Sequence, residues 1–325
     1  MLSTSSIVSC TTALTMALLL CSLSPVSSLS VTVFGGGGFT GSRVCKILVG
    51  EGAKVTSVSR TGSPPKWCAD EEWTKSVDWK SANLLVDDDA SLDRAVGSPD
   101  AVVSCVGAIG TDPGVLRRGN GDANVAAFGS ARRGGRLRRV AYVSVGSEVV
   151  ACGGNWLPEF FGGYFDGKLV AEGAALDAVD GDTSRLCLIR PTFIYGGADF
   201  GLMPPRVNYE YGSAVEELLG LTPFRLLADA TPGLIRVALR PPVCVDSVAA
   251  ACARAAARAD EYGSALPVLD GTDQINEYSG QPKATGLTDA LEWGKVQAVN
   301  FYDWARVEVP KLIDSVQSKI DKTKG

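Results

Sequence analysis

A β-branched run, Leu29-Ser-Val-Thr-Val-Phe34, leads directly into a glycine-rich turn, Gly35-Gly-Gly-Gly38-Phe-Thr-Gly41, and then into Ser42 to Val49, which has helical spacing. This order predicts a buried strand, a turn and a helix. Glycines at the first, fourth and seventh positions permit a tight turn, an approach of backbone to a pyrophosphate and close packing of the helix on the strand. A helix start presents N–H groups and partial positive charge to anions. We therefore expect Gly35, Gly38, Phe39, Thr40 and Gly41 to hold a dinucleotide cofactor.

The residues at the end of the next strand indicate which dinucleotide is expected to bind. Lys54 to Val58 predicts the second strand, and Ser59-Arg60 follows it. Sites that prefer NAD usually place an Asp or Glu near this point to bond the ribose hydroxyls. A guanidinium can instead bind a 2′-phosphate through two hydrogen bonds. Arg60 thus favours NADP(H), with NAD(H) as the alternative if this arginine merely ends a strand at the surface.

Two further strands are expected to reach the cofactor. Val77 to Leu84 predicts the third strand, and Asn83 and Leu84 at its end lie where such folds pass the adenine. Ala101 to Val106 predicts the fourth strand. Gly107 follows it and suits a close approach of backbone to the dinucleotide, although an ordinary turn glycine would look the same.

These elements predict an α/β protein with a Rossmann-type doubly wound parallel sheet, and the chain is long enough to add a small C-terminal lobe. We assign residues 1–28 to a presequence and residues 29–196 to the NAD(P)-binding domain. Residues 197–325 are expected to form the smaller lobe and C-terminal helices that partly complete the sheet. Phe301 to Ile320 has the spacing of an amphipathic helix, which we expect to dock on the domain. Peripheral contact with a membrane is the weaker alternative.

The N-terminal segment is expected to be a cleavable or targeting sequence and not part of the folded domain. Thr11 to Leu23 is an apolar run that is too short to span a bilayer comfortably, so the mature chain is expected to have no transmembrane span. No charged residue precedes Arg43, unlike the arginine-rich pattern of mitochondrial presequences. The cysteines outside this segment are dispersed, which favours a reducing compartment. We therefore expect an organelle, with a plastid favoured, a mitochondrion as the alternative and secretion less favoured.

Composition excludes several kinds of chemistry. The chain has no histidine, which rules out Ser-His-Asp and Cys-His nucleophilic machinery and removes the commonest zinc ligand. No group of residues has metal-ligand spacing, so no metal site is expected. The net charge is −5, and nucleic acid is not an expected partner because no global basic field exists.

Four segments in order carry a resemblance to a known family: the glycine loop, Tyr164-Phe-Asp-Gly-Lys168, Arg190-Pro-Thr-Phe-Ile-Tyr195-Gly196 and Val245-Asp246-Ser-Val-Ala249. Together they resemble the short-chain dehydrogenase/reductase superfamily in its extended or atypical branch. On a helix, Tyr164 and Lys168 project from the same face, and a nearby ammonium is expected to lower the pKa of the tyrosine. Tyr164 is then the candidate acid/base.

The resemblance implies the remaining roles. Lys168 would also bond the nicotinamide ribose, and a serine at the end of the fifth strand would hold the substrate oxygen. Val140 to Ser144 is that strand, so Ser144 is the first choice and Ser147 the reserve. Pro191 would form a wall beside the nicotinamide, and the small C-terminal lobe would be the substrate lobe. Gly167 replaces the usual small hydroxyl residue before the lysine, and it should weaken the helix by up to ~1 kcal/mol.

A narrower resemblance concerns Ser57-Val-Ser-Arg-Thr-Gly62 and Trp73 with Val77-Asp-Trp79. These segments resemble an organellar group that includes a coenzyme Q biosynthesis protein and plastoglobule-associated plant relatives, akin to the nucleotide-binding accessory subunit of respiratory complex I. The implied function is an NADP(H)-dependent oxidoreductase acting on a small or lipid-like carbonyl or quinone-related compound. The alternative is a non-catalytic NAD(P)-binding accessory or assembly protein. An isomerase or dehydratase acting on a nucleotide-sugar-like substrate is less favoured, because no basic cluster for a diphosphate stands out in the lobe.

Overall fold

A parallel β-sheet forms the centre of the protein. The computed structural model describes residues 29–152, 161–198, 201–202, 205–257 and 266–280. Within them, seven parallel strands follow in the order β11-β6-β5-β4-β1-β2-β3. Their bounds are β1 Ser30–Phe34, β2 Lys54–Ser59, β3 Val77–Ser81, β4 Ala101–Ser104, β5 Arg139–Val143, β6 Leu186–Arg190 and β11 Val268–Asp270. The order turns back between β1 and β4, which confirms the predicted Rossmann-type doubly wound fold.

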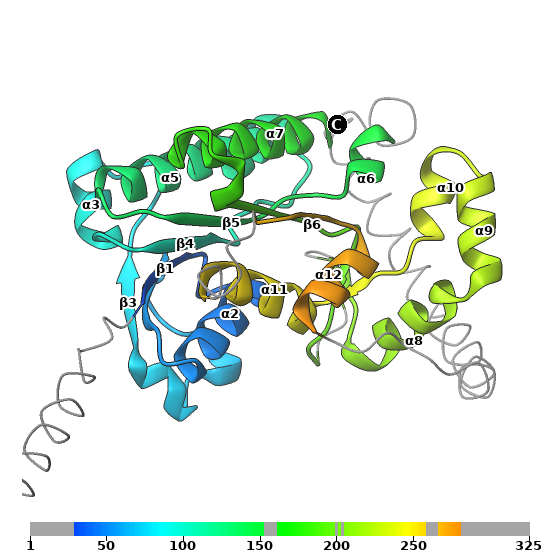
Figure 1. Cartoon of the computed structure of the whole chain (residues 1–325), viewed down its shortest axis with the longest axis horizontal. Coiled ribbons are helices and arrows are strands. Elements are labelled where there is room, and N and C mark those ends of the chain that lie inside the picture. Colours follow the sequence, from blue (N-terminus) through cyan, green and yellow to red (C-terminus); the bar gives the residue numbers. More distant parts are fainter. Residues whose placement is uncertain (1–28, 153–160, 199–200, 203–204, 258–265, 281–325) are drawn as a thin grey trace, which may run out of the picture.

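Helices cover both faces of this sheet, and Figure 1 shows α5 and α7 above it and α2 and α11 below it. One layer holds α2 Phe39–Gly50, α11 Val245–Ala257 and α12 Thr272–Ser279, and the other holds α3 Asp89–Val96, α4 Pro113–Arg117, α5 Ala123–Arg133 and α7 Phe161–Ala178. Val31 and Val248 belong to the apolar cluster under the first layer. Phe34 and Phe128 belong to the cluster under the second. The central strands are apolar almost throughout because both of their faces are buried.

The third strand is shorter than predicted. It ends at Ser81 rather than at Leu84. Asn83 makes a tight turn instead: its side-chain Oδ1 accepts from the Leu85 N–H at 3.1 Å, and its carbonyl accepts from the Val86 N–H at 3.0 Å. Local hydrogen bonding by asparagine competes with the strand ladder, and here it ends the strand.

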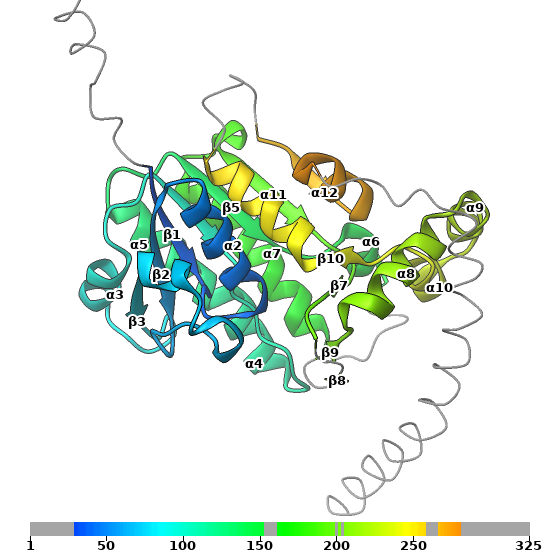
Figure 2. The ribbon, with the colours of Figure 1, turned by 90° about the horizontal axis from the view of Figure 1, so that it is seen from below.

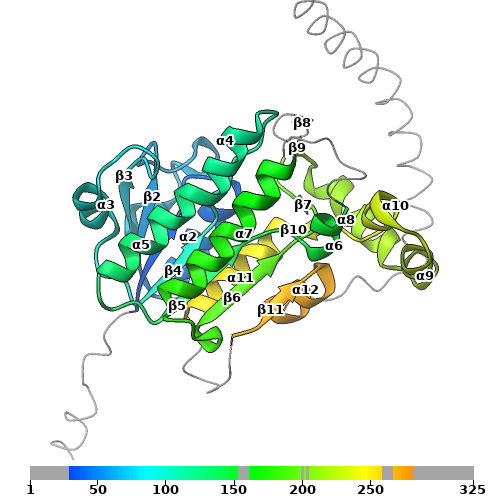
Figure 3. The same cartoon turned by 90° about the horizontal axis from the view of Figure 1, so that it is seen from above.

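Short elements join the main ones. They are η1 Lys66–Cys68, η2 Glu72–Ser76, the π-helical η3 Arg118–Asp122, α6 Ser147–Ala151 and η4 Thr183–Arg185. Figure 3 shows α4, α5 and α7 running alongside one another over the sheet. The segment η3 joins α4 to α5, so it too lies against α7.

A smaller group of helices lies at one end of the sheet (Figure 2). It contains α8 Tyr209–Gly220, α9 Thr222–Ala230 and α10 Gly233–Ala238. The same part of the chain contains two short sheets: β7 Ile194–Tyr195 pairs with β10 Val243–Cys244, and β8 Gly201–Leu202 pairs with β9 Pro205–Arg206. We call residues 194–244 the lobe. The chain then returns to the body through α11, β11 and α12.

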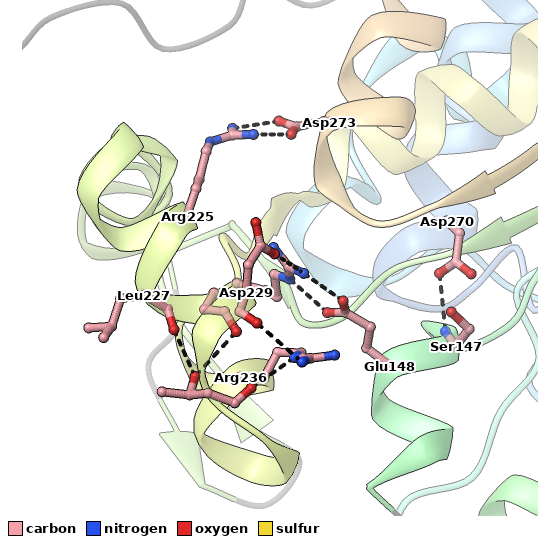
Figure 4. A network of polar contacts seen from close by, with 11 residues as sticks. Ser147, Glu148, Arg225, Leu227, Asp229, Arg236, Asp270 and Asp273 are labelled. Carbon is pink, nitrogen blue, oxygen red and sulfur yellow. Dashed lines mark hydrogen bonds and ion pairs between the residues drawn. The ribbon is translucent and has the colours of Figure 1, made fainter.

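Ion pairs attach the lobe to the body. Arg225 of α9 is paired with Asp273 of α12, and Figure 4 shows the two side chains facing one another. Arg240 donates to both carboxylate oxygens of Glu148 in α6, at 2.7 and 2.6 Å, and to Asp229 at 3.0 Å. These half-buried, bidentate pairs fix the direction in which the lobe leaves the sheet.

Within the described part of the chain, no helix is both long and apolar enough to cross a bilayer. No three His, Cys, Asp or Glu side chains of that part gather as they would around a metal ion. The presequence expected at residues 1–28 and the amphipathic helix expected at residues 301–320 lie outside the described residues.

Candidate functional site

The glycine loop lies between β1 and α2 at the carboxyl edge of the sheet. Gly35 has a positive φ of 76°, which glycine adopts without strain, and its N–H donates to the Val58 carbonyl at 2.8 Å. The Gly38 N–H donates back to the Gly35 carbonyl at 2.8 Å. A methyl group at Gly35 would lie 3.3 Å from the Cys105 carbonyl. The loop therefore crosses directly over the ends of β2 and β4.

The start of α2 has the donor groups that an anion needs. The first helical hydrogen bond runs from the Ser42 N–H to the Gly38 carbonyl at 3.1 Å. The N–H groups of Phe39, Thr40 and Gly41 precede this bond, and Gly38 caps the helix without a side-chain hydrogen bond. The first turn contains no acidic residue. This arrangement fits the pyrophosphate of a dinucleotide.

Arg60 follows β2 immediately and is exposed. Two hydroxyl groups flank it: Ser59 Oγ and Thr61 Oγ1 lie 3.4 Å apart. A methyl group at Gly37 of the loop would lie 3.2 Å from Ser59 Oγ and 3.5 Å from Thr61 Oγ1. Among the described residues, no carboxylate forms an ion pair with Arg60. Sequence reasoning singled out Arg60 but missed the two hydroxyl groups, although they are its immediate neighbours in the chain.

Asn83 and Leu84 lie just beyond β3, at the same edge of the sheet. The Asn83 N–H donates to Asp87 at 2.8 Å, so this residue is anchored by its own turn. Leu84 is half-buried against the apolar cluster that includes Phe34 and Val58. Their expected contact with adenine stays a prediction.

Gly107 follows β4 and is exposed beside a buried lysine. A methyl group there would lie 3.1 Å from Asn120 Oδ1 and 3.6 Å from Lys168 Nζ. Asn120 is fully buried and holds this loop, since its carboxamide bonds both the N–H and the carbonyl of Ala108, at 3.2 and 3.0 Å. The backbone at Gly107 is thereby held next to Lys168.

A second buried asparagine supports the same loop. Asn124 Oδ1 accepts from Ser104 Oγ at 2.5 Å, and its Nδ2 donates to the Asn120 carbonyl at 2.8 Å and to the Val106 carbonyl at 3.3 Å. Sequence reasoning missed both asparagines. The available signal was the spacing of the two asparagines, which are four residues apart and would lie on one face of a helix.

Lys168 is only 5% exposed. Its Nζ donates to the Val143 carbonyl at 2.9 Å and lies 5.0 Å from the centre of the Tyr142 ring and 5.8 Å from that of Tyr164. Burial lowers the pKa of Lys168 to about 8, although the neighbouring Cys105 and Glu172 act in the opposite direction. The structure thus brings Lys168, Tyr164 and the end of β5 together.

The prediction that the Lys168 ammonium lowers the pKa of Tyr164 was wrong. Tyr164 is half-buried, and burial raises the pKa of its hydroxyl to about 12. The Lys168 ammonium faces the ring of Tyr164 and the Val143 carbonyl, and no hydrogen bond links it to the phenol oxygen. Desolvation therefore sets the direction of the pKa shift at this tyrosine.

Gly167 has a packing role that the sequence did not reveal. A methyl group there would lie 2.9 Å from the Arg117 carbonyl and 3.0 Å from the Gly121 nitrogen. At Gly163, one turn earlier, it would lie 2.0 Å from the Pro113 carbonyl. The two glycines allow α7 to lie directly against α4 and η3, and η3 carries Asn120. The cost in helix propensity is offset by this contact.

Ser144 follows β5 and is 4% exposed. Its N–H donates to the Ile189 carbonyl at 2.7 Å, whereas its Oγ is buried and has no partner among the described residues. An unpaired buried hydroxyl costs about 1–3 kcal/mol, so a ligand oxygen would complete this site. Ser147 is exposed and begins α6, where its N–H donates to Asp270 Oδ1 at 3.1 Å. Burial thus favours Ser144 over the reserve.

Pro191 is buried, and its carbonyl accepts from the Gly146 N–H at 2.9 Å. The end of β6 is therefore joined to the segment that carries Ser144. Arg190 donates to Glu172 of α7 at 2.9 and 2.5 Å, and Asp270 lies 3.9 Å from it. Glu172 is one turn after Lys168, so this pair fixes α7 to the sheet. Sequence reasoning placed Arg190 in a family motif at the end of a strand and missed its pair with Glu172.

Comparisons with known proteins agree with this geometry. Residues 31–151 match the profile of the NAD-dependent epimerase/dehydratase family. The uncharacterized chloroplastic protein At1g32220 of Arabidopsis thaliana is 32% identical over 272 residues, which cover 80% of each chain. MIOREX complex component 2 of Saccharomyces cerevisiae is 41% identical over 58 residues, which cover 17% of this chain and 21% of that protein.

A solved structure shares the fold. The Bordetella bronchiseptica enzyme WbmF, in complex with NAD⁺ and UDP, aligns with a TM-score of 0.52 at 18% identity, covering 89% of this chain and 98% of WbmF. The alignment at this identity supports the Rossmann architecture. The family profile, the Arabidopsis relative and the ordered motifs agree, and the chain belongs to the NAD-dependent epimerase/dehydratase family of extended short-chain dehydrogenase/reductases.

Proposed function

We propose that the protein is an organellar NADP(H)-dependent oxidoreductase acting on a small or lipid-like carbonyl or quinone-related compound. The observation that carries this proposal is the buried Lys168, whose Nζ lies between Gly107, the Val143 carbonyl and Tyr164. Burial of a charged group costs free energy unless the group is paired or hydrogen-bonded, and buried titratable groups with shifted pKa values cluster at functional sites. The chloroplastic Arabidopsis relative supports a plastid as the organelle.

Each residue has a defined part in this proposal. Bound nicotinamide dinucleotide would supply or accept the hydride. Ser144 Oγ would donate a hydrogen bond to the substrate oxygen, and the Tyr164 hydroxyl would give a proton to that oxygen or take one from it. The Lys168 ammonium would bond the nicotinamide ribose and, by turning toward the phenol oxygen, favour its ionised form. The pair of Glu172 and Arg190 would hold α7 against the sheet and so keep Lys168 in position.

A second function is favoured by one observation. The pKa of Tyr164 is raised, not lowered, and the Lys168 ammonium is bonded to a backbone carbonyl. A site with these properties suits an accessory protein that holds NADP(H) without turnover, within a quinone-synthesis or respiratory assembly. The two functions share the cofactor and differ only in whether Tyr164 transfers a proton.

NADP(H) preference is tested by replacing Arg60. Arg60→Ala removes charge-assisted hydrogen bonds to a 2′-phosphate, so NADPH should bind at least about tenfold more weakly while NADH affinity stays unchanged. Fluorescence titration of the full-length protein with both nucleotides measures this. Arg94→Ala, at an exposed arginine of α3, serves as the control. A wild type that prefers NADH, or an equal loss for both nucleotides in Arg60→Ala, would contradict the 2′-phosphate assignment.

Turnover separates the two functions. With NADPH and a panel of short-chain benzoquinones and small aldehydes, Tyr164→Phe should lose about 10²–10⁴-fold in kcat, because the proton donor is gone, while NADPH affinity remains. Tyr278→Phe in α12 is the matched control. If the wild type binds NADPH tightly but turns over no substrate of the panel, and Tyr164→Phe complements a deletion strain as well as wild type, the accessory function is the correct one.

Lys168 also makes stability depend on pH. Its pKa is about 8 in the folded protein and near 10.5 in the unfolded chain, so between these values the unfolded chain binds the extra proton. The stability of wild type relative to Lys168→Met should therefore rise by up to about 3 kcal/mol from pH ~8 to ~10.5. Urea unfolding of both proteins across this range measures the difference. A constant difference would show that folding leaves the lysine pKa unchanged.

A further inference from the structure

A glutamate carboxyl group forms hydrogen bonds with both the lobe and the body. Glu216 of α8 is partly buried, and its Oε2 accepts from the Tyr195 hydroxyl of β7 at 2.7 Å. Its Oε1 accepts from Asn276 Nδ2 of α12 at 2.6 Å. Tyr195 and Glu216 belong to the lobe, whereas α12 belongs to the body and lies at its lobe end (Figure 2). We call Tyr195, Glu216 and Asn276 the polar bridge.

Close packing surrounds the polar bridge. Tyr195 is 3% exposed and Asn276 is 6% exposed. A methyl group at Gly212, one turn before Glu216 in α8, would lie 2.1 Å from the Tyr195 ring, so the helix packs directly against this ring. Asn276 Oδ1 is buried and has no partner among the described residues. The polar bridge is therefore part of the packed interior, but its hydrogen bonding is incomplete.

The charged groups around Glu216 do not neutralise it. Within the described part of the chain, no lysine or arginine is paired with Glu216, and Arg225 of α9 is paired with Asp273 of α12 instead. Burial is the largest cause of a raised pKa at Glu216, and the carboxylates of Asp273 and Glu217 raise it further. The hydrogen bonds from Tyr195 and Asn276 act in the opposite direction without reversing the shift.

The remaining titratable groups near Glu216 are neutral in their ordinary states. They are the Cys244 thiol of β10 and the Tyr209 hydroxyl at the start of α8. The pKa of each is raised, for Cys244 mainly by burial and for Tyr209 mainly by Cys244. Neither group therefore supplies a positive charge to balance an ionised Glu216.

The same geometry accommodates a protonated carboxyl group. A tyrosine hydroxyl is both a donor and an acceptor, so the Tyr195 hydroxyl can accept from a proton on Glu216 Oε2 across the same 2.7 Å. Oε1 still accepts from Asn276. Protonation thus removes the charge and keeps both contacts. Loss of the proton leaves a partly desolvated charge beside two other carboxylates, and such a charge is stabilised by access to water.

We propose that Glu216 is a proton-binding site that controls how strongly α8 of the lobe is held to α12 of the body. With the proton bound, the polar bridge is closed and uncharged. When the proton is lost, hydration of the carboxylate favours local opening of α8. This proposal goes beyond the proposed function, because it involves neither the nucleotide nor the pair of Tyr164 and Lys168.

Opening of α8 should therefore increase as the pH rises. The pKa of Glu216 is raised in the closed state and returns to its ordinary value of 4.5 once α8 is open and hydrated. Between these two pKa values, each pH unit favours the open state by up to about tenfold, and above the raised pKa the increase stops. Glu216→Gln is uncharged at every pH, and its amide can bond both Tyr195 and Asn276. In this variant α8 should stay closed throughout.

Hydrogen–deuterium exchange of the full-length protein between pH ~5 and ~8 measures this opening. Wild type and variants are compared at the same pH, so that the chemical exchange rate is the same for each. Glu217→Gln is the matched control, because it removes the neighbouring charge from the same helix and leaves the polar bridge intact. Exchange of α5, on the far face of the sheet, should be alike in all proteins and shows that each is folded.

A pH-dependent rise in α8 exchange in wild type and Glu217→Gln, absent in Glu216→Gln, supports the proposal. Equal α8 exchange in wild type and Glu216→Gln at every pH overturns it, as does a Glu217→Gln variant that behaves like Glu216→Gln. Tyr195→Phe gives a second test. It removes a hydrogen bond that favours the ionised form, so the rise should continue to a higher pH than in wild type. A rise that stops at a lower pH overturns the proposal. No nucleotide is added, so the result is independent of the proposed function.

Discussion

The contact on which the rest of the site depends is the close approach of α2 to the end of β1. A methyl group at Gly41 would lie 2.2 Å from the Gly35 carbonyl oxygen and 2.9 Å from the Gly36 Cα, and both of these are backbone atoms that cannot rotate away. Because Gly41 has no side chain, the first turn of α2 can pack directly against the loop. Its N–H groups then face the edge of the sheet where β1 and β4 diverge. The same approach places Phe39 and Arg43 where the lobe backbone can reach them.

A second close contact builds the part of this edge that carries Lys168. Gly163 and Gly167 let α7 lie against α4 and η3, and Lys168 is buried as a consequence. Burial disfavours the ammonium, which is offset in part by its bond to the Val143 carbonyl and by the nearby Glu172. Arg190 holds Glu172 from the sheet. The site thus depends on two helices whose glycines allow close packing. The start of α2 fits a phosphate group, and α7 carries the lysine.

Sequence patterns predicted the parts of this arrangement that depend on local chemistry. The strand, glycine turn and helix, the arginine after β2, and the Tyr164 and Lys168 pair all follow from spacing along one segment. Prediction failed where a distant segment or a competing turn decides the outcome. Asn83 ends β3 through its own hydrogen bonds, and Gly167 serves a helix contact that only the folded chain creates. Asn120 holds the loop at Ala108 through hydrogen bonds that form only in the folded chain, so its partner could not be predicted from the spacing of the asparagines.

The most direct test of the account is a comparison of two glycine substitutions in the same helix. Gly41→Ala would force α2 away from β1, so it should lower the free energy of unfolding by about 1–3 kcal/mol and abolish NADPH binding. Gly50→Ala, at the other end of α2, meets no atom within 4 Å and should change stability by less than about 1 kcal/mol and leave binding intact. Urea unfolding and NADPH titration of both variants measure this. A Gly41→Ala protein that is as stable as Gly50→Ala and binds NADPH like wild type would contradict the account.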